Sequence, residues 1–508
     1  MAAITFLLAL CTVWVLRHGY VNDLALDRWS KVLQVFGAQA FRIEHFSFLY
    51  PHFPVYVASL LYPVPGLRQG AVPYVVSVLV AGVLILVWMR TMIRRGVGLG
   101  RSVLLLLSII VNPIFLWAVT SGNNLTMIML IFYFIFLSFM KIVEAHYLRA
   151  YLVLAVALGF YFFVDGLAFF LFIALLPMMA FAAPDRIYED SPSSFYLVLG
   201  FPFVLFSLAW AYLNWLFHGD PWAFIRLPES AYLGGRMLVE HFPWLKQYGG
   251  SLFAPMVVVL VAVLISHPVI LFFLWENREK GRRLWASFIM FLHPVVAAAF
   301  ATCNYYLANP LEIMVLTSAS IMAEITIMAE ITRRHFLWLC LLLLLDIPGS
   351  WWVFQHFGND DSRWWSAAMV GSTTAESVRF RGDLMLGRFL AQSPYPTMMD
   401  EKSAGNVIVA KGSGHNLILS FTDRFKIAMR HSVPDVPQLA VPDPETFRGR
   451  KDMLNQHFFE IYRKGLPGYH LVYDQGGWSV YRRDGIEDRA LRLPSSKTSM
   501  DGRSALRS

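Results

Sequence analysis

The charged residues of this chain are distributed very unevenly along it. Residues 356–508 hold half of them, 21 of the 42 Lys and Arg and 17 of the 34 Asp and Glu. About a quarter of this last part is charged, as in an ordinary soluble domain. Residues 1–355 hold the other half, at only about one residue in ten, and a soluble domain could not cover its core with so few charges. The pattern therefore predicts a polytopic membrane region followed by a soluble domain.

The overall composition excludes two other classes. With 57% hydrophobic residues, the chain cannot be intrinsically disordered, because disorder requires low hydrophobicity and high net charge. The net charge of +8 is not gathered with exposed aromatic residues in one soluble patch, so no nucleic-acid partner is expected. Cys11, Cys303 and Cys340 lie in apolar runs and indicate neither a disulfide framework nor a metal site.

Eleven segments are long and apolar enough, or nearly so, to cross a membrane. The first lacks a basic start and a small-residue cleavage site, so we interpret it as an uncleaved span and not as a signal peptide. We expect a polytopic α-helical membrane protein with about 11 transmembrane helices. The segments are approximately 2–16, 72–89, 102–119, 124–140, 149–163, 165–183, 194–216, 252–275, 284–303, 308–331 and 336–355.

The short loops between these segments predict their orientation. Residues 90–101 and 276–283 each carry four basic side chains, and a third loop on the same side holds two adjacent arginines. Loops rich in Lys and Arg stay in the cytoplasm. We therefore expect a multi-pass protein of a bacterial inner or plasma membrane with a cytoplasmic N-terminus. Residues 17–71, residues 217–250 and the C-terminal domain then lie outside the cytoplasm.

Residues 356–488 are predicted to form a small α/β extracytoplasmic domain, and residues 489–508 a disordered polar tail. This domain contains no nucleophile elbow, P-loop, CxxC pair or HExxH motif, so its sequence indicates no catalysis. The periodicity predicts helices at Gly382–Gln392 and Arg450–Lys464, and strands at Asn406–Ala410, Asn416–Phe421, Gln438–Val441, Tyr469–Tyr473 and Trp478–Tyr481.

Within the membrane region, the hexapeptide Ile321–Thr326 is repeated at Ile327–Thr332. Its first copy places Glu324 inside a predicted span. An intramembrane carboxyl group is a functional candidate, although a position towards the end of a helix favours a structural role.

The first outside loop, residues 17–71, is the main candidate for the chemistry, because it is too long for a simple connection. Asp23–Phe36 is amphipathic, which predicts a helix along the membrane surface with Asn22 as its N-cap. Asp23 then lies near the positive end of this helix, and Asp27 lies on the same face one turn later. The spacing alone also allows structural roles, as helix-start electrostatics for Asp23 and a solvated face for Asp27.

Five motifs, in this order, resemble the GT-C superfamily of membrane glycosyltransferases, which includes the protein O-mannosyltransferase and aminoarabinose-transferase families. Members of this superfamily share a first span followed by a long outside loop with an early acidic residue. The resemblance covers about residues 1–355. Its motifs are Val21-Asn22-Asp23, Tyr50-Pro51-His52-Phe53-Pro54, Asn112-Pro113, Asp165-Gly166-Leu167 and the segment from Asn214 to Asp220-Pro221.

The resemblance implies a membrane glycosyltransferase that moves a hexosyl or pentosyl group from a polyprenyl-phosphate donor to a glycan, lipid or protein acceptor by inversion. Asp23 matches the early carboxylate that acts as general base, which a hydroxyl nucleophile needs as it loses its proton. Further residues expected at the donor or acceptor site are Asp27, Glu44, His45, His52 and Asp220. Cations expected to offset the leaving phosphate are Arg42, Arg68, Arg226, Arg236 and Lys246.

The chain also departs from the family pattern. The first loop has no Asp-Asp or Asp-Glu pair, so we expect no metal cofactor, although a divalent ion stays open. Asp165 lacks a preceding basic residue, which favours a packing or polar contact between spans. Two other functions stay open: a transporter or flippase of lipid-linked sugars, and a noncatalytic subunit for cell-envelope assembly. The sequence does not specify the sugar or the acceptor.

Overall fold

The computed structural model describes twelve parts of the chain: 2–36, 52–64, 67, 70–145, 147–182, 192–222, 224, 253–303, 309–328, 332–372, 375–420 and 422–486. The chain divides into two compact units. The first comprises Met1–Arg381 with Gly412–Gly414, and the second comprises Gly382–Lys411 with His415–Ser508. The division therefore falls after Arg381, whereas we predict a boundary after residue 355. The predicted tail, 489–508, lies outside the described residues.

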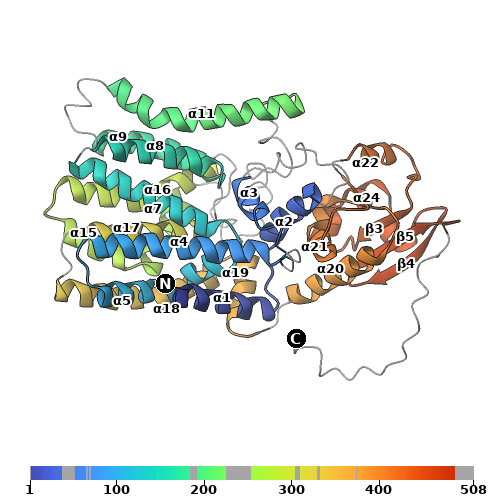
Figure 1. The fold of residues 1–508 in the computed structure, drawn as a ribbon, viewed down its shortest axis with the longest axis horizontal. Helices are drawn as coiled ribbons and strands as arrows, with labels where there is room; N and C mark the ends of the chain where they lie inside the picture. The colour runs from blue at the N-terminus through green and yellow to red at the C-terminus, as the bar shows by residue number, and fades with distance from the viewer. Residues whose placement is uncertain are drawn as a thin grey trace. The chain divides into compact units, whose positions relative to one another are not determined.

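The first unit is built from helices, and its long helices run along a common direction, with the short helices α2 and α3 at one end of them (Figure 1). In chain order the helices are α1 (Ala2–Arg17), α2 (Asp23–Phe36), α3 (Phe53–Ser59), α4 (Val72–Arg94), α5 (Leu99–Ile110), α6 (Pro113–Thr120), α7 (Leu125–Ala145), α8 (Leu148–Phe162), α9 (Ala168–Ala182), α11 (Pro192–His218), α14 (Phe253–Ser266), α15 (Val269–Asn277), α16 (Arg282–Cys303), α17 (Pro310–Ile327), α18 (Arg333–Phe357) and α19 (Asp360–Met369). Helix α20 (Ala375–Gln392) follows.

Each predicted span contains a helix, but the helices differ in length. Among the described residues, six helices are long and apolar enough to cross a membrane, and each of two bent helix pairs would add one more. The other three predicted spans coincide with the shorter apolar helices α1, α8 and α9. The structure thus supports a multi-pass membrane protein with six to eight crossings, while the count of eleven and the orientation stay predictions.

The two bent pairs arise where proline interrupts an apolar run. Helices α5 and α6 meet at 77°, and α14 and α15 meet at 91°. At the first break, Pro113 cannot donate a helical hydrogen bond, and Asn112 begins the new helix by accepting from the Ile114 N–H at 2.8 Å. At the second break, His267-Pro268 separates the helices. Asn112-Pro113, predicted inside one span, therefore marks a bend of that span.

The two breaks are joined to each other by buried hydrogen bonds. Asn112 Nδ2 donates to Ser350 Oγ of α18 at 3.0 Å, and Ser350 Oγ donates to the Ser266 carbonyl at 3.1 Å. His267 continues the chain, with Ser266 and Ser318 hydroxyls 2.8 Å from its two ring nitrogens. Polar groups at a break inside a membrane must find partners within the protein, and here each break supplies partners for the other.

Gly349 allows α18 to approach α14 closely at this point. A Cβ added to Gly349 would lie 2.0 Å from the Ile265 carbonyl oxygen and 3.4 Å from Ser266 Cα. These are backbone atoms, so α14 and α18 would have to separate.

Gly349→Ala is therefore expected to lower the free energy of unfolding by about 1–3 kcal/mol, the usual cost of overpacking. Thermal unfolding in detergent measures this change. Gly100→Ala is the matched control, because Gly100 is also helical and has no atom within 4 Å of its added Cβ. Equal melting temperatures for the two variants would contradict the close approach.

Glu324, near the C-terminal end of α17, is fully buried. Its Oε1 accepts from Asn277 Nδ2 at 2.7 Å and from Ser287 Oγ at 3.3 Å, and Arg283 Nη2 lies 3.6 Å away. The carboxylate of Glu324 therefore connects α17 to α15 and α16, and these contacts give it a structural role.

The second unit contains a five-stranded mixed sheet in the order β2-β1-β3-β5-β4. Strands β1 and β2 are parallel, as are β1 and β3, and β5 is antiparallel to both β3 and β4. The strands are β1 (Thr397–Met399), β2 (Leu417–Leu419), β3 (Gln438–Pro442), β4 (Tyr469–Gln475) and β5 (Trp478–Arg483), and the helices are α21 (Glu401–Lys411), α22 (Asp423–Ala428), α23 (Phe447–Lys451), α24 (Met453–His457) and α25 (Ile461–Lys464).

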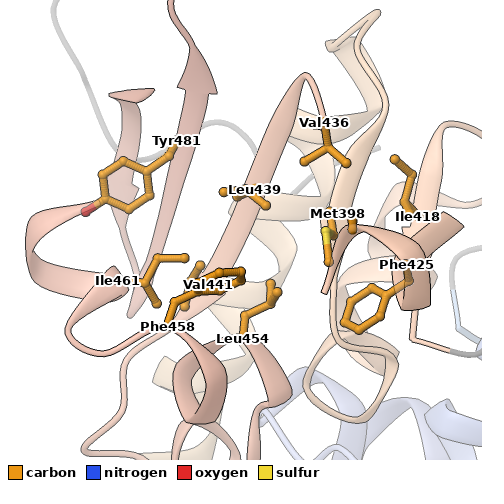
Figure 2. Packing of buried hydrophobic residues seen from close by; sticks show 11 residues of the cluster. Met398, Ile418, Phe425, Val436, Leu439, Val441, Leu454, Phe458, Ile461 and Tyr481 are labelled. Atoms are coloured by element: carbon orange, nitrogen blue, oxygen red, sulfur yellow. The ribbon is translucent and has the colours of Figure 1, made fainter. Parts of the chain in front are cut away.

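An apolar core cluster of this unit lies on one face of the sheet. Leu439 and Val441 of β3 pack with Met398 of β1 and with side chains from the covering helices, including Leu454 and Phe458 (Figure 2). These positions are buried, so the small unit has its own apolar core.

Two predictions for this region are wrong. Asn406–Ala410, predicted as a strand, lies within α21, and Arg450–Lys464, predicted as one helix, contains three short helices. The run of β-branched residues in the first segment favours a strand, but two adjacent parallel strands need a crossover connection, which is usually a helix. In the second segment, Asp452 caps α24 by accepting from the Leu454 and Asn455 N–H groups, so a new helix starts there.

Candidate functional site

The structure describes four of the predicted site residues: Asp23, Asp27, His52 and Asp220. The other seven lie outside the described residues: Arg42, Glu44, His45, Arg68, Arg226, Arg236 and Lys246. The described part of the candidate site consists of α2 and the elements that surround it.

Helix α2 has the predicted bounds, Asp23–Phe36. The predicted N-cap is also confirmed, because Asn22 Oδ1 accepts from the Ala25 N–H at 2.8 Å. Asn22 is buried, whereas Asp23 and Asp27 are half-buried. The two carboxylates are four residues apart and so share one face of the helix. The start of α2 thus has a fixed cap and a partly accessible carboxylate directly after it.

A cluster around Asp361 holds this helix start; we call Tyr20, Asn22, Tyr74, Trp117 and Asp361 the Asp361 cluster. Tyr20 Oη donates to both carboxylate oxygens of Asp361, at 3.0 and 3.1 Å. Asn22 Nδ2 donates to Oδ1 at 3.0 Å, and Trp117 Nε1 donates to Oδ2 at 3.3 Å. The Asn22 backbone N–H donates to Tyr74 Oη at 3.0 Å. Helices α4, α6 and α19 therefore meet at the residue that precedes Asp23.

Asp361 has an unusual protonation equilibrium. The pKa of Asp361 is raised from 3.8 to about 7, mainly by burial and also by the negative charge of Asp23, while hydrogen bonds from Tyr20, Trp117 and Asn22 oppose the rise. Asp23 therefore lies close enough to Asp361 to act on it electrostatically. The sequence reasoning missed Asp361. Asn359-Asp360-Asp361, which follows the last predicted span, is a helix-start signal, but it lies far along the chain from the first loop.

A second polar cluster lies around Asp165 and Glu312; we call Arg28, Asn123, Asn124, Asp165 and Glu312 the Asp165–Glu312 cluster. Arg28 Nη1 of α2 donates to Asn123 Oδ1 at 2.8 Å. Asn124 Nδ2 donates to Asp165 Oδ2 at 3.2 Å and to the Val164 carbonyl at 2.6 Å. Asp165 and Arg28 both act electrostatically on Glu312.

This second cluster joins α2 to three places where helices end or begin. Asp165 accepts from the Leu167 N–H at 2.8 Å and so fixes the turn before α9, while its bond from Asn124 is a polar contact between spans of the kind expected for it. Ser77 Oγ of α4 donates to the Asn123 carbonyl at 2.8 Å. Glu312 lies in the first turn of α17, after the cap Asn309. Sequence reasoning missed Glu312, although an acid just inside the predicted span 308–331 is a recognisable signal.

His52 and Asp220 lie in different surroundings. His52 is buried, its ring stacks on Trp210 with centroids 3.7 Å apart, and burial lowers its pKa to about 3. A neutral, stacked imidazole packs α3 against α11 and is a poor proton donor. Asp220 is part of an exposed turn, where its Oδ1 accepts from the Trp222 N–H at 3.0 Å.

Among the described residues, no group of three or more His, Cys, Asp or Glu side chains is placed to hold a metal ion. The acidic residues of the two clusters are instead bound by tyrosine, asparagine and tryptophan donors or by backbone N–H groups. The expectation on metals stays a prediction.

Comparison with known proteins gives the fold. No protein-family model and no curated protein matches the sequence. The structure of ArnT from Cupriavidus metallidurans bound to undecaprenyl phosphate aligns with a TM-score of 0.56 and 14% identity, over 94% of this chain and 96% of that one. The chain therefore shares the fold of ArnT. ArnT in the apo state aligns with a TM-score of 0.54 and 14% identity, over 94% and 97%.

The pH dependence of stability tests the surroundings of Asp361. Because its pKa is raised to about 7, the folded protein holds this proton more tightly than the unfolded chain does, so its contribution to stability falls as the pH rises from about 4 to 7. Asn cannot ionise. Asp361→Asn should therefore gain stability relative to the wild type between pH 5 and pH 8, measured as the difference in melting temperature.

Asp360→Asn is the control for this experiment. Asp360 is the preceding residue of the same helix, is exposed and lies 3.9 Å from Arg363, so its difference from the wild type should stay constant. A difference for Asp361→Asn that does not change with pH would show that Asp361 does not titrate in this range.

Proposed function

We propose that the chain is a membrane glycosyltransferase, which moves a sugar from a polyprenyl-phosphate donor to an acceptor on the outer face of the membrane. One observation carries this proposal. The ArnT fold extends over 94% of the chain, and at the start of α2 it presents a half-buried carboxylate, Asp23, next to a fully hydrogen-bonded anchor. The bound lipid of that ArnT structure, undecaprenyl phosphate, supports a donor of the same class for this chain.

In the proposed reaction Asp23 acts as general base. An acceptor hydroxyl attacks the anomeric carbon and transfers its proton to the carboxylate, while the bond from that carbon to the phosphate oxygen breaks and the lipid phosphate leaves. A single displacement of this kind inverts the anomeric centre. The base must keep one position for this transfer. Asn22, the residue before it, supports that position because its side-chain Nδ2 and Oδ1 atoms and its backbone N–H all form hydrogen bonds.

Positive charge near the leaving phosphate would lower the barrier. Arg28 is a described cation on the same helix, five residues and so about 7.5 Å along the axis from Asp23. Its bond to Asn123 fixes the guanidinium near the loop between α6 and α7. We propose Arg28 together with the predicted loop cations Arg42, Arg68, Arg226, Arg236 and Lys246 as the source of this charge. Asp27, Glu44, His45 and Asp220 stay proposals for the donor or acceptor site.

A transporter of lipid-linked sugars is the second candidate function, because broken spans often form the binding sites of transporters. Two bent helix pairs are present here. However, the polar groups at these breaks bind one another through Ser350 and are buried, so they do not present a ready substrate site. Translocation of a labelled lipid-linked sugar across proteoliposomes by the Asp23→Asn variant at the wild-type rate would favour the transporter.

The decisive experiment for the enzyme is Asp23→Asn in the full chain in proteoliposomes. Loss of a general base typically costs 10²- to 10⁴-fold in rate. We therefore expect sugar release from a panel of radiolabelled polyprenyl-phosphate sugars to fall at least about 100-fold, with an unchanged melting temperature.

The matched control is Asp423→Asn, because Asp423, like Asp23, is an acid in the first turn of a helix, here α22. If Asp23 only stabilises the start of α2, Asp23→Asn will lower the melting temperature and retain the rate. That result would remove Asp23 from the mechanism.

A further inference from the structure

An apolar groove runs between α7 and α8 on the surface of the helical unit. It has a volume of about 470 Å³ and is lined by Ile131 and Phe134 of α7 and by residues of α8 from Arg149 to Phe160. The eleven helical steps from Arg149 to Phe160 extend for about 16 Å, so the groove follows most of the length of α8. Its volume lies within the roughly 300–1,000 Å³ of small-molecule sites. All its lining side chains except that of Arg149 are apolar.

Basic side chains gather at the Arg149 end of the groove. Arg95, at the end of α4, and Arg149, in the first turn of α8, both act electrostatically on Lys141 of α7. Arg149 is exposed and makes no hydrogen bond or ion pair with any described residue. We call Arg95, Lys141 and Arg149 the basic cluster.

The nearby acid does not neutralise this cluster. Glu144 also acts on Lys141, but its Oε1 lies 3.3 Å from Arg283 Nη1, and Arg283 contacts Glu324 as well. The charge of Glu144 is therefore already shared with a fourth cation. The groove thus combines an apolar lining with an excess of positive charge at its Arg149 end.

We propose that this groove binds an anionic glycerophospholipid, with one acyl chain along α8 and the headgroup phosphate at Arg149. An arginine guanidinium can bind a phosphate through two parallel hydrogen bonds. Basic pockets between transmembrane helices are known to take anionic lipid headgroups. Charge complementarity selects the lipid, since an uncharged or zwitterionic headgroup gains less from three cations.

This site differs from the proposed catalytic site and does not depend on it. The basic end of the groove lies at the start of α8, whereas Asp165 of the Asp165–Glu312 cluster lies in the turn where α8 ends and α9 begins. By the predicted orientation, the basic cluster lies at the cytoplasmic surface and the lipid comes from the inner leaflet. Loss of the lipid should therefore leave the chemistry of Asp23 unchanged.

Native mass spectrometry of the full chain tests the proposal. The protein is incubated with equal amounts of phosphatidylglycerol and phosphatidylcholine of the same acyl chains, and the retained lipids are counted. We expect the wild type to retain phosphatidylglycerol in preference. Arg149→Gln should lower this preference about five-fold, which is the usual effect of one Lys or Arg near an anionic lipid surface.

Two matched controls separate the groove from general surface charge and bulk. Arg334→Gln removes an exposed arginine from the first turn of α18, away from the groove, and should keep the wild-type preference. Ala157→Phe fills the groove without changing charge and should lower lipid retention, whereas Ala209→Phe on the exposed surface of α11 should not.

Three outcomes would overturn the proposal. The first is equal retention of both lipids by the wild type, and the second is an equal effect of Arg149→Gln and Arg334→Gln. The third is full retention by Ala157→Phe, which would place the acyl chain outside the groove.

Discussion

The carboxylate of Asp361 is the point on which the proposed site depends. It accepts hydrogen bonds from a loop tyrosine, an N-cap asparagine and a membrane-helix tryptophan, and so joins the start of α2 to α6 and α19. Without this acceptor, three buried donors would need new partners, at roughly 1–3 kcal/mol for each donor left unpaired. The first surface helix is therefore fixed by a residue more than three hundred positions away, and Asp23 takes its position from that attachment.

The same requirement explains the middle of the helical unit. Two proline breaks free backbone groups where membrane lipid offers no partners. Asn112 at one break, Ser266 and His267 at the other, and Ser350 of α18 supply those partners. The close contact at Gly349 makes this connection short. Bent spans are thus compatible with a rigid unit, because each bend is stabilised by the other.

Local sequence patterns predicted correctly those features that depend on residues close together in the sequence. The bounds of α2, its cap Asn22 and the positions of the helical segments follow from periodicity and capping chemistry. The roles of Asp361 and Glu312 did not follow, because a carboxylate acquires its function here from donors on distant helices. The segment at Asn406–Ala410 failed for a similar reason: its β-branched residues favour a strand, but the parallel pairing of β1 and β2 requires a connecting helix. His52 matched a motif, yet its burial against Trp210 could not be read from spacing.

The contacts of Asn22 explain why an asparagine stands at position 22 and the acid at position 23. An amide at position 22 can donate to Asp361 and accept from the Ala25 N–H at the same time, which a carboxylate cannot do. A carboxylate there would also face that of Asp361 and raise the cost of ionising either group. The acid can therefore stand only at position 23, and a chain of identical composition with these two residues exchanged would lose both the anchor and the base.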